Sequence, residues 1–330
     1  MPKTKIAVLL SILICMSALA QNNRSAVSLT GNDAATCTVP DPCRTFDVAI
    51  SKTNAGGEVI VLSSAGYGPF TVTKAVSIIS PPAYHAALAP TSGDAITINV
   101  DNALVVLRGL TLNGSLGGVN GITFTGQTST ASNTTLYVEN CVISGFSGSG
   151  VNFARNGTLF ISDLIARVNH NAIVIDGSPS LPSTAAIDQA LMERNSFDGL
   201  EVRNATVAIR NSVVALSGST GLYAIALAGG TTADLSVDNC QANHNFNGIT
   251  SGGNSGTARV MLSNSVVSLN ANIGVIANTN GTVRVSNNTV TGNGTGLLQA
   301  SSGVFESRGN NTIRGNTTET AGTITTSGPL

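Results

Sequence analysis

One short phrase recurs between Leu136 and Asn316, and it constrains the fold more than any other feature of the sequence. Each copy alternates apolar and polar residues and then places an anchor residue, as in Leu136-Tyr-Val-Glu-Asn140. The anchors are Asn140, Asp163, Gln189, Asn211, Asn239, Asn264, Asn287 and Asn310. Their spacing varies from 22 residues (Gln189 to Asn211) to 28 residues (Asn211 to Asn239), which is typical of a solenoid. Alternation is strand periodicity, and no copy shows helical spacing, so we expect an all-β coil.

Two further positions recur at nearly constant distances from the anchor. A second Asn follows six residues later in many copies, and an Asn at a bend can adopt left-handed backbone and stack its amide on the next copy. We therefore predict two structural Asn columns, formed by Asn140, Asn211, Asn239, Asn264 and Asn287 and by Asn169, Asn195, Asn245, Asn270 and Asn293. The next strand begins with Gly or Ala before an aliphatic residue, as in Gly248-Ile249. Glycine there suits a tight corner or a positive-φ corner.

These repeats resemble the right-handed parallel β-helix of the pectate-lyase-like superfamily, whose rungs carry Asn stacks at a bend and an aliphatic core. The resemblance covers about two thirds of the chain as rungs. It implies a single-stranded right-handed parallel β-helix solenoid. Because the superfamily mixes lyases, hydrolases, epimerases, phage tailspikes and adhesins, the resemblance implies a fold rather than an activity.

The first 20 residues have the composition of a signal peptide. Lys3 and Lys5 precede an apolar run that ends in Ala18-Leu19-Ala20, a small-x-small cleavage site. The run is too short to span a bilayer, and no later apolar stretch is long enough. We therefore expect a mature chain without a transmembrane segment, exported to the periplasm or the extracellular space.

The rest of the chain is expected to form one elongated domain. Residues 21–57 should form an N-terminal segment and cap, because Phe46, Ala49 and Ile50 have the spacing of a short amphipathic helix that can cover an open rung. Residues 58–316 should form the rungs, with early strands at 58–62, 70–79, 96–100 and 104–112. Residues 317–330 are rich in Thr, Gly and Ser, so we expect a frayed polar tail.

Four cysteines follow the expected cleavage site. Cys37 and Cys43 lie close together in sequence, and in an oxidising compartment a disulfide is favoured over a metal site or free thiols. Cys141 and Cys240 each follow an anchor, four rungs apart. At ~4.8 Å per rung they are ~19 Å apart, too far for a bridge, so both are expected to be free.

Charged residues concentrate in the rungs between Leu159 and Arg210. Counting along the repeat pairs Arg167 with Glu193 and Asp176 with Arg203 on neighbouring rungs, and it places Glu201 on the face of Arg203. These five residues are the candidate ligand-binding site. We favour the alternative interpretation that they are surface ion pairs that keep the rungs in register. With 16 basic and 17 acidic residues, the charge is balanced, which argues against a nucleic-acid partner.

Catalytic motifs of the resembled superfamily are missing. The sequence has no Asn-Thr-Asp set as in polygalacturonases, no Trp-Ile-Asp-His as in pectate lyases and no Asp-Pro-His as in alginate epimerases. His170 and His244 lie three rungs and ~14 Å apart, too far to share a metal ion. No catalytic residue, metal site or cofactor is therefore assigned.

The function that follows is a non-catalytic polysaccharide-binding protein or a structural protein of the cell surface, with a surface glycan as its partner. One alternative is a polysaccharide lyase or glycoside hydrolase with an atypical site, for which Ca²⁺ would be expected if it is a lyase. A further alternative is an adhesin or an autotransporter-like passenger. The sequence leaves open whether the protein is an enzyme.

Overall fold

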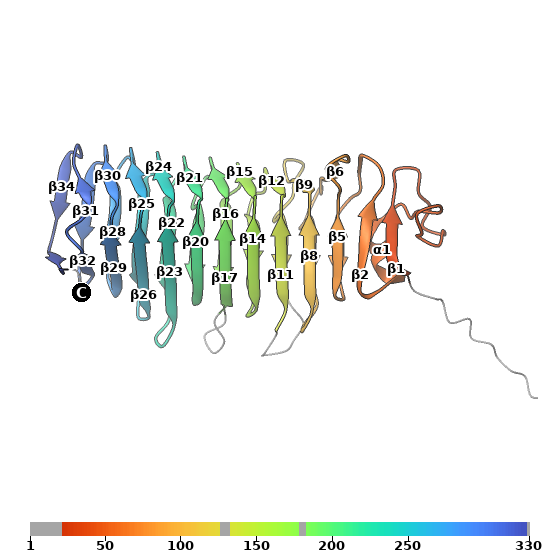
Figure 1. Ribbon diagram of the computed structural model, residues 1–330, viewed down its shortest axis with the longest axis horizontal. Coiled ribbons are helices and arrows are strands. Elements are labelled where there is room, and N and C mark those ends of the chain that lie inside the picture. Colours follow the sequence, from red (N-terminus) through yellow and green to blue (C-terminus); the bar gives the residue numbers. More distant parts are fainter. Residues whose placement is uncertain (1–21, 126–132, 178–182, 329–330) are drawn as a thin grey trace, which may run out of the picture.

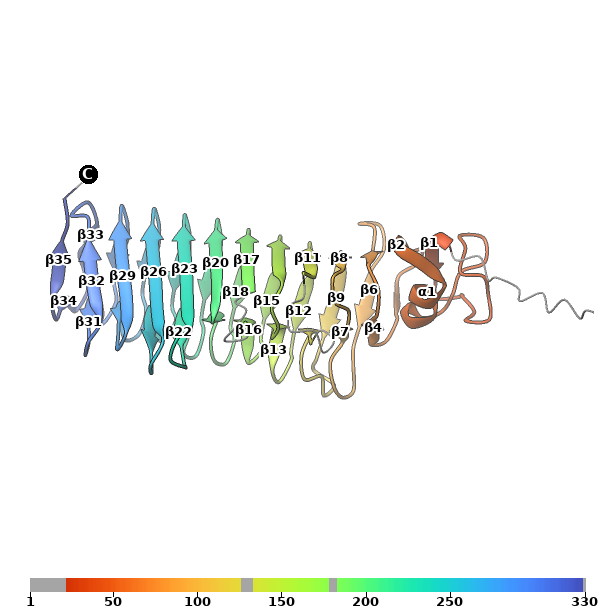
Figure 2. The same cartoon turned by 90° about the horizontal axis from the view of Figure 1, so that it is seen from below.

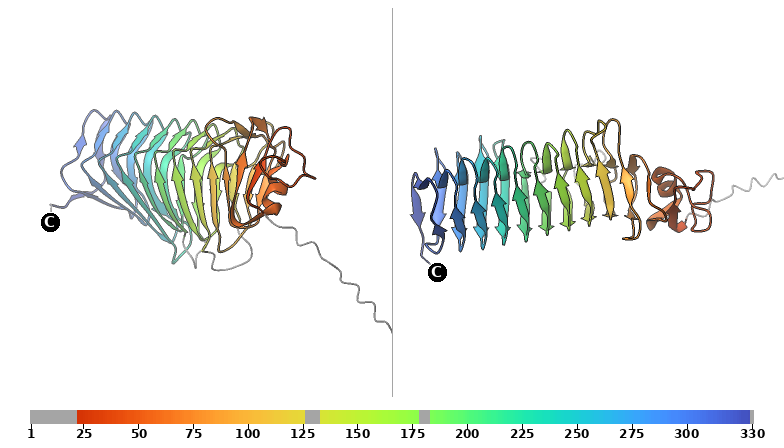
Figure 3. Two further views of the ribbon diagram at one scale, coloured as in Figure 1. Left: turned by 45° about the vertical axis from the view of Figure 1, so that its right-hand side comes forward. Right: turned by 90° about the horizontal axis from the view of Figure 1, so that it is seen from above.

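The chain forms an elongated stack of rungs along one axis (Figure 1). The computed structural model describes residues 22–125, 133–177 and 183–328, so the expected signal peptide at residues 1–20 lies outside them. A complete rung contributes one strand to each of three parallel sheets, which we call the first, second and third sheet in the order in which the chain enters them. The views from below, from above and at an angle show that the rungs stack side by side (Figures 2 and 3).

The bounds of the strands follow the repeat. Among the described residues, the first sheet has 13 strands: β1 (Asn22–Val27), β2 (Thr53–Val61), β5 (Val76–Ile79), β8 (Leu104–Arg108), β11 (Thr135–Glu139), β14 (Thr158–Ser162), β17 (Ser183–Asp188), β20 (Ala205–Arg210), β23 (Thr232–Asp238), β26 (Thr257–Ser263), β29 (Gly281–Ser286), β32 (Val304–Ser307) and β35 (Ile324–Thr326). The second has 11 shorter strands: β3 (Ala65–Gly66), β6 (Ala86–Leu88), β9 (Leu110–Asn113), β12 (Val142–Ser144), β15 (Ile165–Arg167), β18 (Leu191–Glu193), β21 (Val213–Ala215), β24 (Gln241–Asn243), β27 (Val266–Ser268), β30 (Thr289–Thr291) and β33 (Thr312–Ile313). The third also has 11: β4 (Phe70–Val72), β7 (Ile96–Ile98), β10 (Ile122–Phe124), β13 (Ser149–Phe153), β16 (Asn171–Asp176), β19 (Leu200–Arg203), β22 (Thr220–Ala226), β25 (Asn247–Gly253), β28 (Ile273–Ala277), β31 (Thr295–Gln299) and β34 (Thr318–Ala321).

Strands of successive rungs pair in parallel and in register. Leu136 of β11, for example, lies beside Val105 of β8 and Leu159 of β14. All three side chains are completely buried, because inward residues of every rung stack into one continuous apolar core. The predicted all-β parallel solenoid is confirmed. Two of the expected early strands each divide in two, because the chain turns between β4 and β5 and again at Gly109, which has a φ of 73°.

A short helix precedes the first regular rungs. Helix α1 (Phe46–Lys52) buries Phe46, Ala49 and Ile50, as the sequence predicts, and packs against β1, β2 and β4. The Phe46 ring lies 5.2 Å from the ring of Tyr67 and 4.7 Å from that of Phe70. The helix thus brings its apolar face to the end of the core, as a cap requires. Strand β1, within the segment expected to form the cap, also extends the first sheet by pairing with β2.

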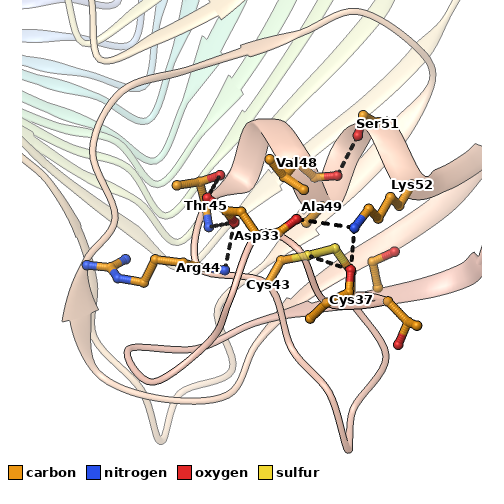
Figure 4. Close-up of a disulfide and its surroundings, with 12 residues drawn as sticks. Asp33, Cys37, Cys43, Arg44, Thr45, Val48, Ala49, Ser51 and Lys52 are labelled. Atoms are coloured by element: carbon orange, nitrogen blue, oxygen red, sulfur yellow. Dashed lines mark hydrogen bonds between the residues drawn. A yellow bond between two sulfur atoms is a disulfide. The ribbon is translucent and has the colours of Figure 1, made fainter.

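A disulfide joins Cys37 to Cys43, which confirms the sequence prediction (Figure 4). Asp33 lies beside it in the same loop and accepts hydrogen bonds from the backbone N–H groups of Arg44 and Thr45, both at 2.9 Å. These bonds tie the loop to the start of α1. Cys141 and Cys240 are free and buried, also as predicted.

The anchor residues form the corner between the first and second sheets. Seven of them, from Asn140 to Asn287, have φ values from 50° to 56°, in the left-handed region that Asn tolerates well. Asn310 differs, because the preceding Gly309 takes this conformation instead. The anchors are exposed, and some of their amides bond between rungs, as from Asn239 Nδ2 to Asn211 Oδ1 at 2.8 Å.

The second Asn column forms a buried ladder between the second and third sheets. Asn270 donates from Nδ2 to Asn293 Oδ1 at 2.9 Å and accepts a bond from the backbone N–H of Asn245 at 3.0 Å. The expectation of left-handed backbone at this column was wrong. The residue before each ladder Asn takes that conformation, as at Val168 (φ 57°) and Leu269 (φ 57°), because this turns the Asn inward to meet buried backbone groups.

The glycines that start the strands of the third sheet serve close packing and do not adopt positive φ. A Cβ on Gly248 would lie 2.4 Å from the carbonyl oxygen of Gly274 and 2.9 Å from Asn270 Nδ2. Gly221 and Gly274 are confined in the same way by the next rung and by a ladder Asn. The prediction of a tight corner is confirmed, and the alternative of positive φ is wrong for these residues.

Regular pairing continues past Asn316. Strand β34 pairs with β31, and β35 pairs with β32, so paired strands extend into the segment that we expected to be frayed. Their side chains are half-buried or exposed, which explains why the sequence there lacks a strong apolar pattern.

Candidate functional site

The charged residues predicted from the repeat occupy the expected registers. Asp176 of β16 lies opposite Arg203 of β19, and their Oδ2 and Nη1 atoms are 3.5 Å apart. Arg203 also bonds through Nε to Glu201 Oε1 at 2.7 Å. These three side chains form an ion-pair cluster on the third sheet.

Arg167 and Glu193 lie on a different sheet. They face each other in β15 and β18 of the second sheet, with Nη1 and Oε1 at 4.0 Å. The five predicted ligand residues therefore divide between two sheets rather than lining one groove. Ion pairing accounts for all five, and their role in ligand binding stays a prediction.

A buried acidic pair adjoins the cluster on the third sheet. Asp198 is completely buried and accepts a bond from the backbone N–H of Thr220 at 2.7 Å, and Glu201 is only 4% exposed. Asp198 Oδ2 and Glu201 Oε2 have no hydrogen-bond partner in the part of the chain that the structure describes. Burial raises the pKa of the Asp198 carboxyl to about 6, and the charge of Glu201 acts in the same direction.

The metal-binding side chains and the free thiols of the described residues are dispersed. Within residues 22–125, 133–177 and 183–328, no three His, Cys, Asp or Glu side chains are arranged to hold a metal ion. Burial raises the pKa of the Cys141 and Cys240 thiols to about 11, so both stay protonated and unreactive at neutral pH.

The outer face of the first sheet carries a shallow depression that the charge pattern of the sequence does not predict. We call it the trough and define it by five outward residues in register on successive rungs: Tyr137, Phe160, Ala186, Ala208 and Ser236. The Tyr137 and Phe160 rings stack at 4.9 Å with an angle of 16° between their planes. The small side chains that follow leave the floor low, and the trough has a volume of about 550 Å³.

Charged residues flank the trough two residues further along each strand. Arg210 Nη2 lies 2.8 Å from Asp188 Oδ2, and Arg108 Nη2 lies 2.5 Å from Glu139 Oε2. Asp238 accepts hydrogen bonds from Ser263 Oγ at 2.7 Å and from Asn264 Nδ2 at 2.6 Å. Hydrogen bonds from Asn211 and Arg210 lower the pKa of Asp188, and those from Asn264 and Ser263 lower the pKa of Asp238.

Two smaller depressions continue from the trough along the same face. Their volumes are about 350 and 300 Å³; both include Ser236, Met261 and Arg284, and the second reaches Ser327. Met261 is 58% exposed. It protrudes from the column of the trough residues, one rung beyond Ser236. The face thus offers a long, open and shallow track across many rungs.

One position of the repeat indicates where the trough lies. The residue three positions before each anchor from Asn140 to Asn287 points outward, and it is aromatic in two adjacent copies and Ala in the next two. The pattern of charged residues does not reveal this position, because a binding surface made of rings and small side chains has no strongly charged group.

The family model described as "Right handed beta helix region" matches residues 149–318, more than half of the chain. The chain belongs to the right-handed β-helix family. None of the curated proteins matches the sequence. No helix among the described residues is long and apolar enough to cross a membrane.

Several solved structures share the fold. Pectate lyase Pel9A is 15% identical with a TM-score of 0.60, and the match covers 91% of this chain and 80% of that chain. The A-module of the Azotobacter vinelandii mannuronan C-5 epimerase AlgE4 is 17% identical with a TM-score of 0.61, covering 83% and 91%. The catalytic unit of an α-1,3-glucanase from Streptomyces thermodiastaticus is 14% identical with a TM-score of 0.53, covering 92% and 68%. At these identities the likeness shows the fold alone.

Proposed function

We propose that this protein binds a polysaccharide along the trough without cleaving it. The observation that carries the proposal is the stacked pair of Tyr137 and Phe160 beside the low floor formed by Ala186 and Ala208. One face of a sugar ring presents C–H groups, which pack well on an aromatic ring. Phe160 is 37% exposed, so its ring is available for such a contact.

The spacing of the rungs suits an extended polymer. Successive rungs present equivalent positions every ~4.8 Å, so neighbouring sugar units along the axis would meet similar surroundings. Polar groups at the sides, including Ser162 and Asp188, are placed to bond sugar hydroxyls. The shallow and open form of the track accommodates a long chain without requiring a chain end.

The carboxylates beside the trough are poorly suited to acid catalysis. A general acid needs a raised pKa so that it holds its proton near neutral pH. The pKa values of Asp188 and Asp238 are instead lowered, and Glu139 is engaged by Arg108. These properties support binding without cleavage.

Similar folds support a glycan as the ligand. The names of the pectate lyase, the mannuronan epimerase and the α-1,3-glucanase all refer to polysaccharide chemistry. Export through the expected signal peptide would bring the chain to the periplasm or the extracellular space, where such polymers occur. The proposed binding needs neither a cofactor nor a metal ion.

The test combines binding with product release. The mature chain is titrated by calorimetry with a panel of soluble plant and bacterial polysaccharides, and each mixture is assayed for new reducing ends and unsaturated ends. We expect saturable binding to at least one polymer and no release of products. Protein-dependent release would contradict the proposal, and failure to bind any polymer would favour a structural role at the cell surface.

An enzymatic function is the second candidate, because one observation favours it. The pKa of Asp198, about 6, lies in the range of a general acid, and Glu201 and Arg203 are nearby. Glu201→Gln and Arg203→Ala would then abolish product release in protein that circular dichroism shows to be folded. Activity that persists in both variants would remove this site from consideration. The burial of Asp198 and Glu201 weighs against it, because a substrate-contacting carboxylate must be accessible.

A further inference from the structure

The charges around the trough bear on the chemical class of its ligand, an inference that rests on the proposed function. Four charged residues line the trough: Glu139, Asp188, Asp238 and Arg210. Three are acidic, and the single cation is already bonded to Asp188 at 2.8 Å. A ligand carboxylate would therefore meet acidic neighbours and no unengaged guanidinium.

The same arrangement continues along the first sheet. Arg259 forms two bonds to Asp234, at 2.5 and 2.7 Å, and Arg284 Nε lies 2.6 Å from Glu306 Oε2. Arg308, at the far end of the track, donates to the carbonyl oxygen of Gly328 at 3.0 Å. At ~4.8 Å per rung, it lies about 14 Å from Asp238. Recognition of an acidic polymer normally relies on bidentate Arg contacts. Arg259 already makes such a contact with Asp234, and Arg284 and Arg308 each donate one hydrogen bond within the protein.

The acidic residues are also satisfied within the protein. Glu139 is paired with Arg108, Asp188 with Arg210 and Asn211, and Asp238 with Ser263 and Asn264. Because the pKa values of Asp188 and Asp238 are lowered, both remain negative at neutral pH. Arginines neutralise Glu139 and Asp188, whereas Asp238 accepts both of its bonds at Oδ1 from neutral side chains and keeps its charge.

We infer that the trough selects an uncharged polysaccharide, a polymer of neutral hexoses, pentoses or N-acetylated sugars. The aromatic pair and the alanine floor would contact the apolar faces of the sugars. Ser162, Ser236 and the outer oxygens of the flanking carboxylates would accept bonds from sugar hydroxyls. A uronate would place like charges side by side and weaken binding.

The experiment compares polymers that differ only in charge. The mature chain is titrated with polygalacturonate, alginate and a glucuronan, and separately with the carboxyl-reduced form of each polymer. Each titration is run with EDTA and with calcium, at low salt and at high salt. We expect at least one reduced polymer to bind at least tenfold more tightly than its parent, with an affinity that salt changes by less than twofold. Tighter binding of a parent polyuronate, with or without calcium, or of chitosan would overturn the inference but leave polysaccharide binding intact. Failure of every reduced and parent polymer to bind would overturn both.

A charge-gain variant provides an independent arm. Ser236 is exposed on the floor, so Ser236→Lys places an additional cation in the trough. We expect it to raise polyuronate affinity at low salt by at least fivefold, whereas Ser268→Lys on the second sheet should leave it unchanged. Equal behaviour of the two variants would contradict the placement of the ligand in the trough.

Discussion

Asn245 shows how a single side chain stabilises two rungs at once. Its Oδ1 accepts a bond from the backbone N–H of Ser217 at 2.9 Å, and its Nδ2 donates to the Val214 carbonyl at 3.1 Å and to Asn270 Oδ1 at 3.2 Å. The side chain is 1% exposed, so water cannot replace these partners. Loss of the amide would leave buried donors and acceptors unsatisfied.

Asn245→Val should therefore lower the free energy of unfolding by about 1–3 kcal/mol, because Val fills a similar volume without bonding to any of the three groups. Chemical denaturation monitored by circular dichroism measures the change. Asn243→Val is the matched control, since Asn243 is half-buried within strand β24, where a β-branched residue is tolerated. Equal stability of the two variants would show that the ladder contributes nothing measurable.

Asp198 should make stability depend on pH. An aspartate in an unfolded chain has a pKa near ~3.9, whereas burial raises the pKa of Asp198 to about 6 in the folded protein. Between about pH 4 and about pH 6 the folded state thus holds more of this proton than the unfolded state does, so this group's contribution to stability falls as pH rises. The difference between these two pKa values corresponds to about 3 kcal/mol at most.

Asp198→Asn should remove that dependence, because its amide oxygen can still accept the bond from Thr220 and carries no charge. Denaturation midpoints measured across the window should fall less steeply with pH than in the wild type, and the variant should be the more stable protein above about pH 6. An unchanged slope would contradict the assignment of the buried proton to Asp198.

At the scale of the elements, glycine sets how closely the third sheet approaches the Asn ladder. Gly248→Ala would place a methyl group 2.4 Å from the Gly274 carbonyl oxygen and 2.7 Å from Val267 Cγ1, so two backbones must separate. We expect a loss of about 1–3 kcal/mol in the free energy of unfolding, measured by chemical denaturation. Gly66→Ala is the control, because no atom lies within 4 Å of the added Cβ. A Gly248→Ala variant as stable as this control would refute the close approach.

The two faces of each strand in the first sheet have different roles. In β14, Leu159 and Ile161 are buried in the core, whereas Phe160 between them points outward to the trough. Parallel pairing without a register shift places Phe160 beside Tyr137 and Ala186. The same alternation that makes the core therefore also makes the candidate binding surface.

For the whole molecule, the sequence predicted features that repeat or that depend on neighbours in the chain. The period predicted the solenoid, the spacing of Phe46, Ala49 and Ile50 predicted α1, and the ion pair between Asp176 and Arg203 followed from counting. The disulfide followed from short spacing and compartment. These features depend on local pattern, which is preserved from rung to rung.

Features that depend on the exact path of the backbone were not predictable. Left-handed φ at Val168 and Leu269 runs against the preference of β-branched and bulky residues, so no sequence rule places it there. The division of the five predicted ligand residues between two sheets could not be predicted either, because it depends on where the chain turns at each corner. The trough could not be predicted, because it forms only where Ala186 and Ala208 lie in register with the two stacked rings.

The most direct test of the central claim is the affinity of Phe160→Ala for the polysaccharide that binds the wild type most tightly, measured by calorimetry. Phe197→Ala is the control, because Phe197 is also exposed, at 43%. It lies away from the trough and stacks on His170, with 5.1 Å between the two ring centroids. We predict a loss of about tenfold or more for Phe160→Ala and less than twofold for Phe197→Ala, with both variants melting as the wild type does. Unchanged affinity in Phe160→Ala, or an equal loss in Phe197→Ala, would contradict polysaccharide binding at the trough.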